Sequence, residues 1–157
     1  MKESRNVESF GLDHTKVKTP YVRAAGRKTG VKGEVVTKFD IRFMQPNKEY
    51  MNTGGIHTLE HLMAEYIRDE LDGVIDMSPM GCRTGFYLVV FGEPTEKFIA
   101  EKIRNVLVKV AAWDPAEAVP GVDPVMCGNF LDHDLVEAKR LAAKWVEGID
   151  RKGFSCF

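Results

Sequence analysis

The sequence has few cysteines, little net charge and no long apolar run. Three cysteines in 157 residues are too few, and odd in number, for a disulfide scaffold. A net charge of −1, from 22 basic and 23 acidic residues, argues against nucleic acid or an anionic membrane as partner. The longest uncharged apolar run, near residues 85–92, is far short of the ~20 residues of a membrane-spanning helix. The N-terminus shows no secretory signal, so we expect a reducing, cytoplasmic setting.

What is present fits a globular protein. Hydrophobic residues make up 44% and charged residues 29% of the chain, which excludes the disordered and low-complexity classes. No internal repeat or flexible linker divides the sequence. We therefore expect a single domain over residues 1–157, long enough to bury a substantial core.

Strand and helix patterns alternate along the chain. Apolar residues at every second position predict a hairpin whose second strand has one wet face. The predicted strands cover residues 16–25, 35–43, 74–77 and 86–91. The predicted helices, from apolar residues at helical spacing, cover residues 56–71, 94–113 and 135–148. Together they indicate an α+β fold in which an antiparallel or mixed β-sheet packs against helices, with a proline-containing loop over residues 114–125.

The sequence His57-Thr58-Leu59-Glu60-His61 carries the strongest chemical signal. Four residues apart on a helix, His57 and His61 lie on one face and can bind the same transition metal. Glu60 reaches the same region and suits a base better than a third ligand. This H-x-x-E-H arrangement is the one found in inverzincin metallohydrolases, and it suggests a related fold.

The spacing leaves the remaining ligand open. Candidates are Cys82, Cys127, Cys156, Asp76, His14 and His133. Cys127 is slightly preferred, because Gly128 beside it allows close backbone approach, and two imidazoles with one thiolate leave an open catalytic position. Cys82 follows a predicted turn, where a thiol can serve as an acid/base group or simply pack in the core.

The chain resembles the S-ribosylhomocysteine lyase family, whose product is the precursor of autoinducer-2. The resemblance rests on the H-x-x-E-H segment and on matching segments spread over nearly the whole chain. These segments are residues 7–10 with 12–14, residues 39–43 with 45–47, residues 78–82, Cys127-Gly128 and residues 135–142.

The resemblance implies a ligand set, a cofactor and an assembly. The metal is expected to be Fe²⁺, with Zn²⁺ or Co²⁺ as substitutes, held by His57, His61 and Cys127. Cys82 and Glu60 are expected to be the acid/base groups. The resemblance also implies a homodimer with two sites at its interface. The expected substrate-binding residues are Ser9, His14 and Arg42 at the ribose end, contributed by the neighbouring subunit, and Arg68 and Asp76 at the homocysteine end.

The reaction implied is the cleavage of S-ribosylhomocysteine to L-homocysteine and 4,5-dihydroxy-2,3-pentanedione. Two carbonyl shifts precede β-elimination of the thioether. Each shift removes a proton beside a carbonyl, which calls for a Lewis acid and for positioned bases.

Two other functions use parts of the same sequence pattern. A metallopeptidase-like hydrolase could use the same helix, with Glu60 activating a water molecule, but such enzymes usually have longer chains and a distant glutamate as third ligand. A non-catalytic module with a structural metal needs four protein ligands and leaves Glu60 without a role.

Overall fold

The computed structural model describes residues 7–157. The prediction that the N-terminus carries no secretory signal concerns residues 1–6 among others, and these six lie outside the described residues. A four-stranded antiparallel sheet has the order β1-β2-β4-β3. Its strands are β1 (Tyr21–Thr29), β2 (Val35–Arg42), β3 (Val74–Pro79) and β4 (Gly85–Phe91). The helices are α1 (Glu8–Gly11), α2 (Thr53–Glu70), α3 (Glu96–Ala111) and α4 (Leu135–Lys152). The predicted α+β fold is therefore confirmed, and the described sheet is wholly antiparallel.

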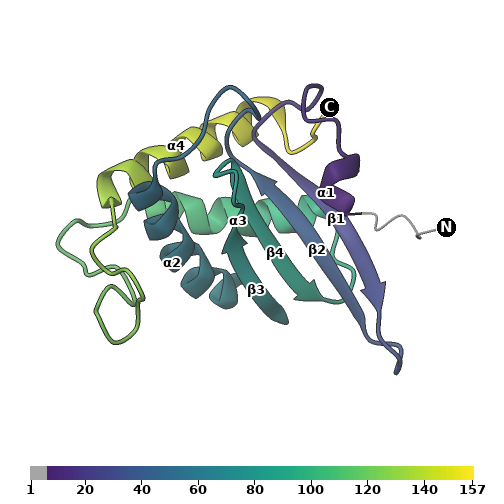
Figure 1. Ribbon diagram of the computed structural model, residues 1–157, viewed down its shortest axis with the longest axis horizontal. Coiled ribbons are helices and arrows are strands. Elements are labelled where there is room, and N and C mark those ends of the chain that lie inside the picture. The colour runs from purple at the N-terminus through teal and green to yellow at the C-terminus, as the bar shows by residue number, and fades with distance from the viewer. Residues whose placement is uncertain (1–6) are drawn as a thin grey trace.

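The three long helices pack on one another and cover one face of the sheet, as Figure 1 shows. Their apolar stripes and the inner face of the sheet form one hydrophobic core, with Trp145 of α4 among its largest buried side chains. The indole of Trp145 donates to the carbonyl oxygen of Arg42 at 3.1 Å, which ties α4 to the end of β2. Over the described residues, no helix combines the length and apolar character needed to cross a membrane.

The predicted hairpin forms, but the face of its second strand that was expected to be exposed to solvent is buried at the end of β2. Asp40 and Arg42 are 0% and 1% exposed, as buried as Ile41 between them. The apolar residues at every second position predict the strand correctly. The prediction that the polar side chains between them face solvent is wrong for Asp40 and Arg42. These charges tolerate burial because they pair with each other and with neighbouring polar groups.

Helix α2 begins earlier than its apolar pattern indicates. Asn52 caps it by accepting a hydrogen bond from the Gly55 backbone N–H at 2.6 Å. Glycine is required inside this first turn because α4 lies against it. A Cβ on Gly55 would stand 2.7 Å from Glu137 Cγ, and one on Gly54 would stand 3.0 Å from Asp134 Cβ. The start of α2 is thus held against the segment that leads into α4.

Candidate metal centre

Helix α2 presents His57 and His61 side by side, one turn apart. Their ring centroids are 4.8 Å apart and their planes cross at 78°. The Nδ1 of His57 faces the carbonyl oxygen of Asp132 at 2.8 Å, and the Nδ1 of His61 faces that of Pro120 at 2.7 Å. A carbonyl only accepts, so each Nδ1 carries the proton and each Nε2 has a free lone pair. Both rings are therefore oriented as metal ligands.

The loop between α3 and α4, residues 112–134, supplies these carbonyls and lies beside α2 (Figure 1). It approaches His61 closely at Gly121, whose φ is +72°. A Cβ at that position would stand 3.1 Å from His61 Nδ1. The glycine that permits close approach is therefore Gly121. The role expected of Gly128 is wrong, because a Cβ there would meet nothing within 4 Å.

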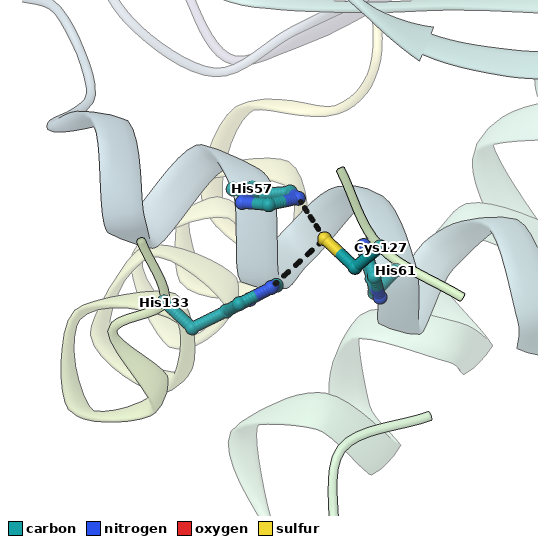
Figure 2. Close-up of side chains that lie close together, drawn as sticks. All are labelled: His57, His61, Cys127 and His133. Atoms are coloured by element: carbon teal, nitrogen blue, oxygen red, sulfur yellow. Dashed lines mark hydrogen bonds between the residues drawn. The ribbon is translucent and has the colours of Figure 1, made fainter. Parts of the chain in front are cut away.

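The same loop brings Cys127 and His133 to the two α2 histidines, as Figure 2 shows. The Cys127 Sγ lies 3.4 Å from His57 Nε2 and 3.9 Å from His133 Nε2. Donor atoms of these four residues all lie within 4.8 Å of one another, a group that could hold a metal ion. His133, one of the candidates that the spacing left open for the remaining ligand, is thus part of the cluster.

The His133 ring is stacked on that of His57, with centroids 3.9 Å apart and planes at 25°. Burial, and then the nearby His57 and His61 rings, lower the pKa of His133 from 6.5 to about 4. The ring is therefore neutral at physiological pH. Sequence offered only a weak signal for it, a histidine six residues after Cys127 and directly before the Asp134 cap of α4.

Glu60 lies at the rim of the cluster. Its Oε2 is 3.8 Å from His61 Nε2, the nitrogen that is free to bind a metal, and its side chain is 30% exposed. A carboxylate at this distance is close enough to exchange a proton with a molecule held in the cluster.

A second group of predicted residues meets elsewhere, in a pocket of about 400 Å³. The predicted residues that line it are Ser9, His14, Arg42 and Cys82. They come from α1 and the segment after it, the end of β2 and the β3–β4 turn. No residue of the histidine–cysteine cluster lines this pocket within the described chain. The structure therefore divides the predicted site into two groups.

Arg42 is fixed at the floor of this pocket. Its guanidinium binds Asp40 through two hydrogen bonds of 3.0 and 2.7 Å, and it donates to the Thr84 hydroxyl at 2.7 Å. Burial lowers the pKa of Arg42, but the hydrogen bonds and charge of Asp40 outweigh it, so the pKa is raised. The Thr84 hydroxyl also lies 3.1 Å from the Cys82 Sγ. The Thr84 hydroxyl therefore links the positively charged Arg42 guanidinium to the Cys82 thiol.

Arg68 and Asp76 join neither group. The Arg68 guanidinium donates to the Ala64 carbonyl of its own helix, and Asp76 accepts from the Ser78 hydroxyl at 2.8 Å on an outer strand. All three cysteines are free, and Cys156 lies near the C-terminus, away from both groups.

The α+β fold thus brings together two imidazoles oriented by carbonyls, a thiol and an adjacent carboxylate, a group that could bind a metal ion. The chain belongs to the S-ribosylhomocysteinase (LuxS) family, whose model matches residues 7–153. This match covers both groups of residues.

The sequence of this chain aligns with those of individual relatives over nearly their whole length. The chain is 57% identical over 138 residues to the S-ribosylhomocysteine lyase of Thermus thermophilus, which covers 88% of this chain and 87% of that protein. It is 52% identical over 142 residues to the S-ribosylhomocysteine lyase of Deinococcus radiodurans, covering 90% and 89%. It is 49% identical over 149 residues to that of Pediococcus pentosaceus, covering 94% and 95%.

Proposed function

We propose that this protein is a carbon–sulfur lyase that cleaves S-ribosylhomocysteine to L-homocysteine and 4,5-dihydroxy-2,3-pentanedione, the autoinducer-2 precursor. The observation that carries the proposal is the histidine–cysteine cluster with Glu60 at its rim, in a chain of this family. The whole chain, residues 1–157, acts as one lyase domain. Its setting is the cytoplasm, where the free thiols of Cys82 and Cys127 stay reduced.

The cofactor in this proposal is Fe²⁺, which Zn²⁺ or Co²⁺ can replace, held by His57, His61 and Cys127. The donor set fits, because imidazole and thiolate ligands suit these borderline cations better than Mg²⁺ or Ca²⁺. When bound, the cation supplies Lewis-acid stabilisation of negative charge on the sugar oxygens. The H-x-x-E-H helix is, in our proposal, related to that of metallohydrolases. A thiol in place of a distant glutamate favours the lyase over the hydrolase.

Cys82 and Glu60 are the proposed acid/base pair. Two carbonyl shifts move protons between carbon and oxygen before the thioether leaves. The Cys82 thiolate removes protons from carbon, helped by the positive charge of Arg42 across the Thr84 hydroxyl. Glu60 exchanges protons with oxygen and removes the last proton before elimination.

The separation of the two groups supports a homodimer. In our proposal, Ser9, His14 and Arg42 complete the metal site of the partner subunit, and Cys82, which shares their pocket, goes with them. Each dimer then has two sites at its interface. Apolar side chains on the sheet face away from the long helices provide a surface for the second copy. Among them are Val36, Val89 and Phe91, which line a groove there. Arg68 and Asp76 hold the homocysteine end.

The direct test is incubation of the metal-loaded protein with S-ribosylhomocysteine, followed by titration of the thiol that is released. We expect thiol and the dione in equal amounts. The same protein stripped of metal, and a His57→Ala variant, are the controls. Metal-loaded protein that releases no thiol from this substrate would overturn the proposal.

A further inference from the structure

The cluster contains one histidine more than the proposed ligand set uses. His133 stands within hydrogen-bonding reach of Cys127, stacks on His57 and comes from the same loop as the thiol (Figure 2). Its role follows from what each ring nitrogen faces and from how the rings are inclined.

The partners of Nδ1 separate His133 from the two ligand histidines. His57 and His61 face carbonyl oxygens, which fix the proton on Nδ1 and leave Nε2 free for a metal. His133 Nδ1 instead lies 3.1 Å from the hydroxyl of Thr58. A hydroxyl can donate as well as accept, so the proton of His133 is free to reside on Nε2.

The Thr58 hydroxyl is able to donate in this direction. It donates to the Gly54 carbonyl oxygen at 2.9 Å and accepts the Asp134 backbone N–H at 2.9 Å. The Gly54 carbonyl already accepts that same N–H at 3.1 Å. That carbonyl therefore keeps a hydrogen bond when the hydroxyl turns its one proton from Gly54 to His133 Nδ1, as the inference requires.

The ring planes argue against His133 as a ligand alongside His57. An imidazole binds a metal along a lone pair in its own plane, so two ligand rings must both contain the ion in their planes. Rings 3.9 Å apart and 25° from parallel have planes that intersect far beyond a metal–nitrogen bond of about 2.0–2.1 Å. The His57 and His61 planes, at 78°, do converge at short range.

We propose that His133 is a positioning residue that donates its Nε2–H to the Cys127 thiolate while Thr58 donates to its Nδ1. The inference rests on the ligation by Cys127 proposed above. A thiolate is only an acceptor, so a bare Nε2 beside it would set two lone pairs against each other. The backbone N–H of Asn129, 3.4 Å from the same sulfur, is a second donor.

This donor has a defined effect on the metal centre. A hydrogen bond to a thiolate withdraws charge from sulfur, which weakens its donation to the cation and leaves the cation a stronger Lewis acid. Stacking on His57 also limits rotation of that ligand ring. His133 thus acts on two ligands without binding the ion.

The test compares Co²⁺-loaded wild-type protein with His133→Phe, which keeps an aromatic ring and loses the N–H. We expect the sulfur-to-cobalt charge-transfer band to move to longer wavelength, because sulfur electrons are less stabilised. We expect Co²⁺ affinity, measured by chelator competition, to fall roughly 10–100-fold, because Cys127 loses the hydrogen bond that orients it and this loss outweighs the stronger donation from sulfur. His133→Gln, which can place an amide N–H near the Nε2 position, should restore the wild-type band.

Thr58 provides the matched pair. Thr58→Ser keeps the hydroxyl and should leave the band unchanged, whereas Thr58→Val should shift it in the same direction as His133→Phe. An unmoved band in His133→Phe would overturn the inference. So would a loss of Co²⁺ binding as complete as in His57→Ala, since that identifies a ligand. Cys127→Ser should show no charge-transfer band. If Co²⁺-loaded wild-type protein shows none either, the metal site itself is refuted.

Discussion

The two groups of functional residues are built in opposite ways. The metal cluster takes two histidines from one turn of α2 and two residues from a loop without helix or strand. The Cys82 pocket takes its central residue, Arg42, from a strand, locked by a buried ion pair. The first group depends on loop closure for its geometry, and the second on compensation of buried charge. Substitutions in the two groups should therefore impair the protein for different physical reasons.

The largest expected effect separates the two groups directly. His57→Ala and Cys82→Ala should each lower activity by at least about 10³-fold, since one removes a ligand and the other an acid/base group. If a site combines the cluster of one chain with the pocket of the other, mixing the two variants leaves one intact site in each heterodimer. With random exchange, activity should return to roughly a quarter of wild type.

The matched control pairs Cys82→Ala with Arg42→Ala, two lesions in the same pocket. Every site in their heterodimer lacks one of the two residues, so activity should stay at the level of the single variants. Mixing His57→Ala with Arg42→Ala should behave like the first pair and recover. No recovery in the test pairs despite proven exchange would mean that each chain builds its own site. Recovery in the control would mean that the Cys82 and the Arg42 of one site come from different chains.

Glu60→Gln should separate catalysis from metal binding within the cluster. The amide keeps the shape but cannot accept a proton, so we expect a loss of about 10²–10⁴-fold in turnover with metal content unchanged. Metal is measured by elemental analysis, and a ketone intermediate is sought in the reaction mixture. Loss of metal in this variant would instead make Glu60 a ligand.

Asp40→Asn should show that the pocket depends on charge compensation. It leaves the Arg42 guanidinium buried without its carboxylate, and we expect a loss of about 3–5 kcal/mol in the free energy of unfolding, measured in urea. Asp150→Asn, which breaks the exposed pair with Arg104, is the control and should leave stability unchanged within error. Equal effects would contradict the distinction drawn between the two ion pairs.

Gly121→Ala should produce the smallest of these effects, confined to the metal cluster. Its φ of +72° strains any side chain by about 1–2 kcal/mol, and the new Cβ would press on His61. We expect weaker metal affinity with little change in the pocket, measured by chelator competition. Gly128→Ala, which meets nothing and has no positive φ, should match wild type.

In α2, the sequence predicted the arrangement of the functional side chains. The spacing of His57, Glu60 and His61 on one helix is a local property, and the structure places the two rings together with the carboxylate beside them. The antiparallel hairpin and the other two strands also follow from patterns of neighbouring residues. Helical and strand periodicity fix such features because they depend on a few consecutive residues.

Sequence alone did not select which distant residues join that helix. Spacing left Cys127 barely preferred over Cys82, and resemblance to a family was needed to separate them. His133 enters the cluster only because residues 112–134 fold back on α2, and Arg42 is buried only because Asp40 and Thr84 satisfy it. Loop closure and burial of paired charge depend on contacts between residues far apart in the chain, so the tertiary structure decided them.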